Sequence, residues 1–274
     1  MPNILRKMKT TLTNPVQYHL HLGEDEILLN DYLGKTLALH YTGYIFCIQC
    51  GRKTTRSFQQ GYCYPCYRRL LECNLCMIHP ERCLVEIGKC HTQDWAHHHC
   101  HQTHIVYLAN TSGVKVGITR ETHIPTRWID QGAQQAVPII IVKNRYRAGL
   151  VEVALKKFVN DKTNWRSMLK NEVTHVNLLE CRDQIFHQSH QSLNEIRQKF
   201  QDDIEFLNET TVTISYPVLE YPEKITSLSF DKTKEISGIL LGIKGQYLIL
   251  NSGVINLRKY GGYEIQISVK KKVN

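Results

Sequence analysis

The 274-residue sequence lacks any apolar run long enough to cross a membrane as a helix. Its longest apolar stretches, such as residues 137–142, fall far short of the roughly 18 apolar residues that a span requires. The N-terminal residues carry Lys and Arg but no continuous apolar stretch after them, so a secretory signal is not expected. A repeat of fixed period is also missing, which excludes a solenoid. These absences predict a globular cytoplasmic protein without a membrane partner.

Cysteine, in contrast, is abundant. The chain has ten cysteines, and nine of them lie between residues 47 and 100. A chain of this length builds a core without disulfide staples, so in the absence of a secretory signal these cysteines indicate metal binding.

The net charge of +9 originates in the middle of the chain. Residues 105–175 contain 11 basic and 5 acidic residues, whereas residues 1–46 and 176–274 are balanced. Residues 47–104 have 7 basic and 4 acidic residues, but two zinc ions held by thiolates would make this segment slightly negative. A basic excess confined to 105–175 favours a surface that binds the phosphates of nucleic acid.

Hydrophobic patterning predicts an α+β fold. Alternating residues at 18–22 and 36–41 predict strands, and residues 105–108 and 114–119 predict a hairpin followed, after Pro125, by a helix. A second helix is predicted over 148–158. A third follows from apolar residues spaced by three and four, as on one helix face: Leu193, Ile196, Phe200, Ile204 and Leu207.

The last segment, 211–274, holds six of the sixteen glycines between short β-branched runs, as in a small antiparallel barrel or sandwich. Five segments are expected along the chain. They are an N-terminal β segment (1–46), a zinc-binding module (47–104), a small α/β domain (105–176), a helical connector (177–210) and a small β-barrel-like module (211–274).

Two Cys-x2-Cys pairs predict a structural zinc site. Twelve residues separate them, enough for the chain to fold back so that four thiolates converge on one ion. The predicted ligands are Cys47, Cys50, Cys63 and Cys66.

A second zinc is expected from the cysteines that follow. Cys73 and Cys76 form another short pair, and the remaining ligands are two of Cys83, Cys90, Cys100 or His104. These groups exceed the four that one tetrahedral ion needs, so the sequence leaves the choice open. Cys181 stands alone in a helical stretch and is expected to be a buried thiol.

The predicted hairpin carries two further motifs, Ile105-Val106-Tyr107 and Lys115-Val116-Gly117. Arg127 lies on the helix that follows and Glu152 on the next one. In this order the segment resembles the core of the GIY-YIG nuclease superfamily. The resemblance implies that Tyr107 and Gly117 belong to a catalytic site.

By the same resemblance, Tyr107 sits beside the attacking water, Arg127 steadies the scissile phosphate, and Glu152 holds Mg²⁺ or Mn²⁺. A divalent ion and a guanidinium neutralise charge that develops on a phosphoryl oxygen. The asparagine that many members carry later in the chain corresponds to either Asn164 or Asn171.

The whole chain also resembles an uncharacterised bacterial family, in which a Cys-rich zinc module precedes this core and a Gly-rich β module follows it. Residues 104–133, 161–166 and 242–248 carry the resemblance. Residues 161–166 mix charged, amide and aromatic side chains and are expected to line the cleft.

Two functions are consistent with these observations. The first is a zinc-stabilised, Mg-dependent phosphodiesterase that acts on DNA or RNA. The alternative is a non-catalytic nucleic-acid-binding protein with a degenerate GIY-YIG fold, because Lys115 stands where the superfamily has a tyrosine. Retention of Arg127 and Glu152 favours the enzyme over the binder. The basic surface separates both from a third possibility, a zinc-stapled scaffold for other proteins. The residues expected to bind phosphate are Lys115, Arg120, Arg145 and Arg147.

Overall fold

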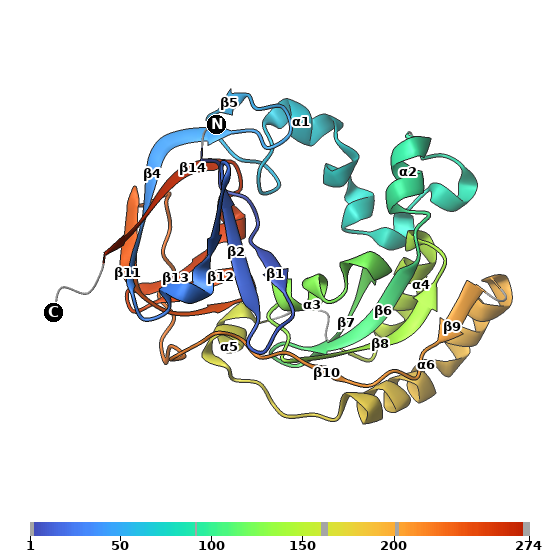
Figure 1. The fold of residues 1–274 in the computed structure, drawn as a ribbon. Helices are drawn as coiled ribbons and strands as arrows, with labels where there is room; N and C mark the ends of the chain where they lie inside the picture. Colours follow the sequence, from blue (N-terminus) through green and yellow to red (C-terminus); the bar gives the residue numbers. More distant parts are fainter. Residues whose placement is uncertain (1–2, 91, 160–163, 201–202, 271–274) are drawn as a thin grey trace. The chain divides into compact units, whose positions relative to one another are not determined.

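The computed structural model describes residues 3–90, 92–159, 164–200 and 203–270. The chain divides into two compact units (Figure 1). The first consists of Met1–Cys73, Leu169–Asn171 and Ile214–Asn274, and the second of Asn74–Met168 and Glu172–Thr213. Both contain antiparallel sheets, which confirms a mixed α+β protein.

Two sheets build the first unit. The smaller has the order β1-β2-β3, formed by β1 (Lys9–Thr11), β2 (Gln17–Leu22) and β3 (Asp25–Leu28). Along β2, half-buried and fully buried residues alternate, which is the period-two pattern that predicted this strand.

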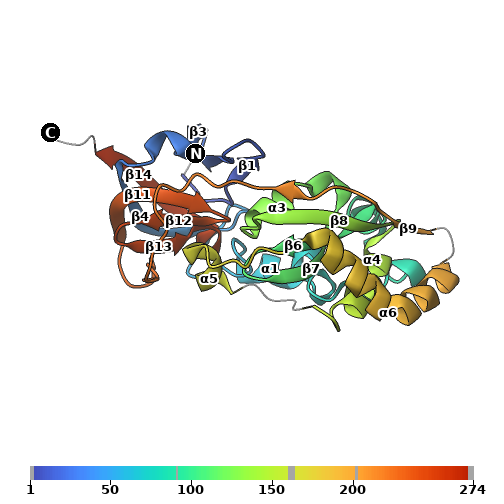
Figure 2. The same cartoon turned by 90° about the horizontal axis from the view of Figure 1, so that it is seen from below.

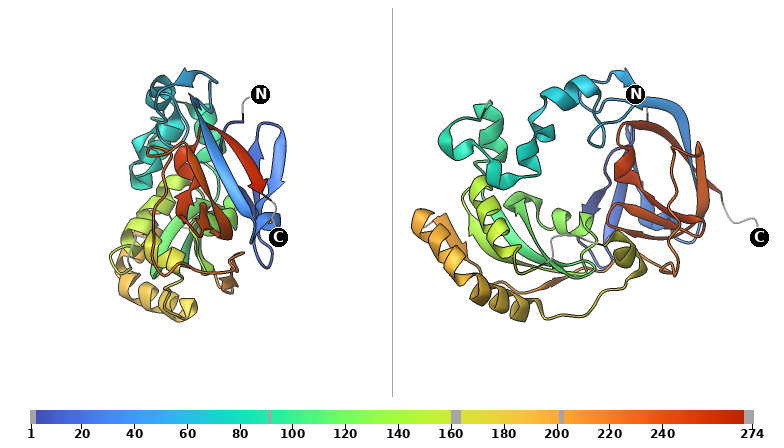
Figure 3. Two further views of the ribbon diagram at one scale, coloured as in Figure 1. Left: turned by 90° about the vertical axis from the view of Figure 1, so that its left-hand side faces the viewer. Right: turned by 180° about the vertical axis from the view of Figure 1, so that it is seen from behind.

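The larger sheet of the first unit has the order β13-β12-β11-β4-β14, with β5 paired to β4. Its strands are β4 (Thr36–Phe46), β5 (Lys53–Thr54), β11 (Glu235–Lys244), β12 (Tyr247–Leu250), β13 (Gly253–Asn256) and β14 (Tyr263–Lys270). The predicted antiparallel C-terminal strands are thus present. The sheet also includes β4, which pairs with β11 and β14 (Figure 3).

The pairing of β4 shows that the compact units do not follow the segment boundaries predicted from the sequence. Leu39 faces Ile236 on one side and Ile267 on the other, so a strand from the predicted segment 1–46 completes the sheet of the predicted module 211–274. Local patterning does not reveal such a pairing, because the partners lie far apart in sequence. The first unit also contains the helix α1 (Tyr64–Arg69) and three 3-10 turns, η1 (Leu29–Tyr32), η2 (Leu71–Cys73) and η8 (Leu257–Tyr260).

A five-stranded antiparallel sheet forms the centre of the second unit. Its order is β10-β8-β6-β7, with β9 paired to β8. The strands are β6 (His104–Asn110), β7 (Val114–Arg120), β8 (Gln135–Val142), β9 (Ile204–Phe206) and β10 (Val212–Thr213). The hairpin of β6 and β7 confirms the one predicted from sequence. Every residue of the central strand β6 is buried.

Helices α4 (Arg145–Leu155) and α6 (Leu178–Phe200) pack against one another and against this sheet (Figure 2). The shared core includes Val106 and Leu108 of β6, Val151 of α4, and Leu178 and Ile185 of α6. Because side chains alternate along a strand, Tyr107 projects from the opposite face of the sheet.

The remaining elements of the second unit are short. They are η3 (Leu75–Met77), η4 (Pro80–Arg82), η5 (Val85–Ile87), α2 (Gln93–His99), η6 (Glu121–His123) and α3 (Thr126–Asp130). Helix α5 (Trp165–Lys170) follows α4. Helices α3 and α4 confirm the first two predicted helices, within a few residues at the ends.

The third predicted helix is wrong at its C-terminal end. Helix α6 ends at Phe200, and Ile204 begins the strand β9, where it pairs with Val142 of β8. The helical spacing of Ile204 and Leu207 is therefore coincidental. Ile204 is buried through sheet pairing with the same core.

Candidate functional site

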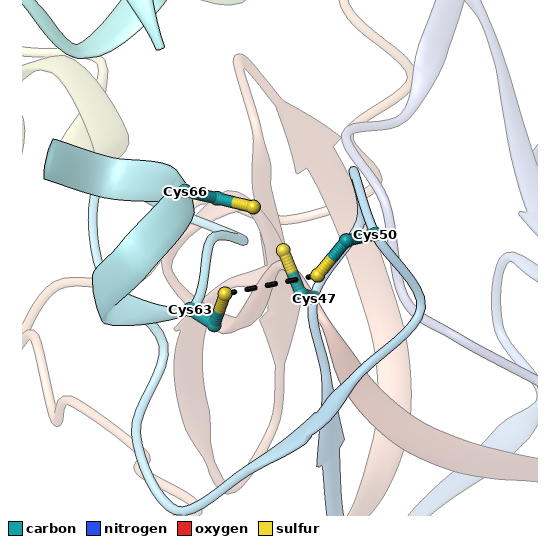
Figure 4. Close-up of side chains that lie close together, drawn as sticks. All are labelled: Cys47, Cys50, Cys63 and Cys66. Carbon is teal, nitrogen blue, oxygen red and sulfur yellow. Dashed lines mark hydrogen bonds between the residues drawn. The ribbon is translucent and has the colours of Figure 1, made fainter. Parts of the chain in front are cut away.

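Four cysteines meet at one point in the first unit (Figure 4). Their sulfur atoms all lie within 4.8 Å of one another, and Sγ of Cys50 is 3.8 Å from Sγ of Cys63. Four thiolates at about 2.3 Å around a tetrahedral zinc are about 3.8 Å apart. A disulfide needs a separation of about 2.05 Å. The spacing therefore fits a metal ion rather than disulfide bonds, as predicted for this set of cysteines.

Each pair of cysteines is held by a tight local turn. Cys47 follows β4, and its carbonyl accepts a hydrogen bond from the amide of Gly51, whose φ of 69° lies in the left-handed region. Glycine adopts this conformation without a Cβ penalty. On the other side, Cys63 is the N-cap of α1 and Cys66 lies in its first turn. Three of the four thiols are buried, which suits a structural site closed to water.

The surroundings of Cys47 within the cluster favour the thiolate form of this cysteine. Burial raises the pKa of Cys47, but hydrogen bonds from the backbone amides of Cys63, Cys50 and Gln49 outweigh it and lower the pKa to about 6. For Cys66, burial and hydrogen bonds with the neighbouring thiols raise the pKa. The thiolate is the form that binds a metal, so Cys47 is prepared to begin metal binding at neutral pH.

The second predicted zinc site is less compact. Among the described residues, no other group of three ligating side chains comes as close together as the first. Cys83 and Cys100 are both buried and joined by a hydrogen bond, and Cys90 packs against them. Cys73 belongs to the first unit, whereas the other cysteines of this group belong to the second.

His104, the other candidate ligand, is fully buried. Its Nδ1 donates to the carbonyl of Gln102 at 2.6 Å, and its Nε2 has no hydrogen-bond partner among the described residues. Burial lowers the pKa of His104 to about 4 and keeps the ring neutral. A second zinc site stays a prediction.

In the second unit, Tyr107 of β6 is in electrostatic contact with Arg127 of α3 and Glu152 of α4. Its phenol oxygen accepts hydrogen bonds from Nε2 of Gln131, at 2.7 Å, and from the Arg127 side chain. Burial raises the pKa of Tyr107, and the nearby guanidinium opposes that rise. The structure thus brings three of the predicted catalytic side chains together.

Gly117 completes this arrangement from the neighbouring strand. It pairs directly with Tyr107, and a Cβ at position 117 would lie 2.6 Å from the phenol oxygen. Lys115, two residues earlier on β7, projects from the same face of the sheet. Only glycine leaves room for the ring to lie across β7 toward α3.

Glu152 is mostly buried and lies 3.4 Å from Nζ of Lys156, one turn later on α4. Burial raises the pKa of Glu152, while Lys156, Arg145 and Arg127 lower it. Mg²⁺ in phosphoryl-transfer sites is commonly bound by one or two carboxylates together with substrate phosphates. Glu152 offers one such carboxylate, in electrostatic contact with the guanidinium of Arg127.

Two polar side chains near Tyr107 were not identified as site residues from the sequence. Gln131 follows Arg127 by four residues, a helical spacing that was available as a signal. Trp128 is 2% exposed and lies edge-on to Tyr107, and its Nε1 has no partner among the described residues. A buried N–H without a partner is uncommon in folded proteins.

The predicted phosphate-binding arginines are engaged within the protein. Arg120 contacts the carbonyl of His98 and the ring of His123. Arg145 donates to the carbonyls of Cys76 and Met77.

Arg147 pairs with Glu86 and Asp203 and lies over the ring of Phe200. A phosphate would compete with these contacts. The role of Arg120, Arg145 and Arg147 in nucleic-acid binding stays a prediction.

The remaining candidates have local roles. Asn164 caps α5 by accepting from the amides of Arg166 and Ser167. Asn171 has a φ of 63° and accepts from Lys244. Residues 161–163 lie outside the described residues. Cys181 is only partly buried and packs against the core of the second unit.

The fold and the cysteine cluster define a mixed α+β protein with a four-cysteine centre suited to a structural metal such as zinc. The chain belongs to the DUF2797 family of proteins of unknown function, which it matches over residues 34–265. No match was found among curated proteins or among solved structures. Membership of the GIY-YIG superfamily stays a prediction. None of the helices formed by the described residues is long and apolar enough to span a membrane.

Proposed function

We propose that this protein binds nucleic acid and cleaves its phosphodiester bonds in the second unit, with Mg²⁺ or Mn²⁺ as the catalytic ion. The observation that supports this most directly is the convergence of Tyr107, Arg127 and Glu152. The Tyr107 phenol is in electrostatic contact with the guanidinium of Arg127 and the carboxylate of Glu152. They form a suitable set for stabilising a reacting phosphate.

Each side chain has a distinct task in this proposal. Arg127 donates to the charge that develops on the phosphate, and its planar fork makes two parallel hydrogen bonds. Tyr107 is fully buried, so it acts by holding the guanidinium in place and by passing a proton, not by contact with bulk solvent. Glu152 would release Lys156 to hold a divalent ion, which would supply polarisation of the phosphate and activation of water.

The competing function is a binder that does not cut. Lys115 and the Glu152–Lys156 ion pair favour it, because a carboxylate already paired with an ammonium has a structural role without a metal. Cleavage assays separate the two. Wild type with Mg²⁺ or Mn²⁺ is incubated with single- and double-stranded DNA and RNA, alongside E152Q and R127K.

We expect E152Q to lose cleavage by at least about a hundredfold while it still binds nucleic acid, since it keeps its shape but loses the charge that the ion needs. R127K is expected to be similarly impaired because an ammonium lacks the planar fork. The exposed Glu121 and Arg197 provide matched controls, E121Q and R197K. Absence of wild-type cleavage, or full activity in E152Q, would leave the binder as the better account.

We further propose two structural zinc ions per chain, the second held by the buried pair Cys83 and Cys100 together with Cys90 and Cys76. The contacts of Arg145 with the backbone at Cys76 support this set, since they fix that loop in the second unit. Metal analysis of purified protein tests it. The variants C47S and C83S are each expected to lose one zinc, and C181S none.

A further inference from the structure

A basic cavity of about 390 Å³ lies in the first unit, next to the four-cysteine centre. Its lining residues Ile48 and Tyr62 are sequence neighbours of the ligands Cys47 and Cys63. Four positively charged side chains line it, and none of the described residues that line it is acidic. The charged residues are Arg6, Lys7, Lys9 and Arg258.

The walls of this cavity are fixed by contacts that are distant in sequence. Nη2 of Arg6 donates to the carbonyl of Ile48 at 3.4 Å, and Nε of Arg258 donates to Oε1 of Gln60 at 2.6 Å. Ser57 donates to the carbonyl of Gly261 at 2.7 Å. The segment between the two cysteine pairs is therefore attached to η8 and to Gly261, and the first cysteine pair is attached to the N-terminal segment through Ile48.

Two residues between the cysteine pairs also have an unusual backbone conformation. Gln59 and Gln60 have φ values of 46° and 66°, in the left-handed region that non-glycine residues rarely occupy. Two such residues in succession persist only where the surroundings enforce them, and such sites are enriched at functional surfaces. The backbone of the cavity wall at Gln60 is thus held in one conformation by its surroundings.

Arg6 and Lys9 place positive charge at this cavity, and positive charge attracts an anion. Guanidinium groups bind phosphate through paired hydrogen bonds. The aromatic ring of Tyr62 and the amide of Gln60 suit a base or a sugar. The volume is within the range of small-ligand sites, which is about 300–1,000 Å³.

We propose that this cavity binds a nucleotide phosphate, either of a free nucleotide or of an unstacked nucleotide in a single strand. A cavity of about 390 Å³ has the size of a small-ligand site and so suits one nucleotide rather than a base-paired duplex. The proposal rests on the nucleic-acid-binding part of the proposed function and is independent of cleavage, which is placed in the other unit.

Binding by the zinc-loaded full chain tests the proposal. Titrations use a fluorescent single-stranded oligonucleotide, adenosine 5′-monophosphate and inorganic phosphate. The pocket variant R6Q/K9Q is compared with K224Q/K232Q, which removes the same charge from exposed lysines of the same unit that do not line the cavity. Zinc content and circular dichroism verify that each variant is folded.

The pocket variant is expected to bind the oligonucleotide at least about tenfold more weakly than wild type, with a shallower salt dependence. The control is expected to lose no more than about twofold. Loss of adenosine 5′-monophosphate binding in the pocket variant would identify a free-nucleotide site. Loss of oligonucleotide binding alone would identify a strand-binding site.

Equal losses in the two double variants, or none in either, would overturn the proposal, because the pocket would then contribute nothing beyond net charge. Its failure is distinguishable from failure of the proposed function. If E152Q and the pocket variant both bind the oligonucleotide like wild type, the pocket assignment fails while nucleic-acid binding stands. If wild type binds no oligonucleotide, the proposed function fails, and the mononucleotide titration still decides on the cavity.

Discussion

The phenol oxygen of Tyr107 lies 2.6 Å from the position that a Cβ on Gly117 would occupy. The two residues face each other across β6 and β7, and the ring uses the space that a side chain would fill. Because Tyr107 also accepts from Gln131, it connects the hairpin to the segment after α3. Gly117 is thus a condition for the arrangement of the candidate catalytic site.

Replacing Gly117 with alanine is expected to displace the Tyr107 ring. Inserting a methyl into a filled site costs about 1–3 kcal/mol of unfolding free energy, measured by urea denaturation. The double variant Y107A/G117A is expected to lose less than the sum of the single variants, because the ring whose Oη and Cζ lie 2.6 and 2.7 Å from that Cβ is gone. Additive losses would show that the two residues do not share this space.

The four-cysteine centre predicts a metal-dependent first unit. C47S removes one of four buried thiolates, so it is expected to lose zinc and at least about 3 kcal/mol of stability. Thermal unfolding with and without a chelator, together with metal analysis, measures both effects. The partly buried Cys181 lies outside the cluster, so C181S serves as the control. Unchanged stability in C47S with full zinc content would contradict the site.

Features set by short sequence separation could be read from the sequence. The hairpin of β6 and β7 follows from alternation around Gly113, and the cysteine cluster follows from the spacing of its two pairs. The hairpin and the cluster both form where the chain reverses direction over a short stretch of sequence. Tyr107, Arg127 and Glu152 could be named because their order along the hairpin and helices resembled a known core.

Features set by distant contacts could not be read in this way. Pairing of β4 with β11 joins residues such as Leu39 and Ile236, and nothing local specifies that partner. The end of α6 at Phe200 was missed because Ile204 continues the helical spacing while it pairs in a sheet. The cavity lined by Arg6 and Arg258 likewise exists only once both ends of the chain share one unit.

Lys244 predicts a pH-dependent stability. It is fully buried, its Nζ donates to Asn171 at 2.9 Å, and it lies 5.3 Å from the ring centres of Tyr216 and Tyr221. Burial lowers the pKa of Lys244 to about 8, from 10.5. Above the lowered pKa the folded protein binds fewer protons than the unfolded chain, so this lysine increases stability as pH rises from about 8 to 10.5.

The variant K244M is expected to lose this contribution, which amounts to at most about 3 kcal/mol across that interval. Urea unfolding of wild type and K244M at pH 7.5 and 10 measures the difference between their pH profiles. The cysteines titrate in both proteins and cancel in the comparison. Parallel profiles would mean that Lys244 is charged and solvated in the folded state.

Arg147 is expected to contribute to stability more than to nucleic-acid binding. Its side chain is 14% exposed, and its Nε lies 2.7 Å from Oε1 of Glu86. Burial opposes ionisation of Glu86, but the hydrogen bonds from Arg147 and Asn144 outweigh it and lower the pKa of that carboxyl. The ion pair therefore stabilises the fold above the ordinary carboxyl pKa, and this contribution is lost as the pH falls through the lowered one.

Removing Arg147 with R147A is expected to cost about 1–3 kcal/mol at pH 7, because Glu86 and Asp203 are left without their partner. The loss should shrink as the pH falls through the lowered pKa of Glu86, because that carboxyl then becomes protonated. Oligonucleotide affinity, measured at a temperature where both proteins are folded, is expected to stay within about twofold of wild type. A large affinity loss in R147A with unchanged stability would instead place Arg147 on the phosphate-binding surface.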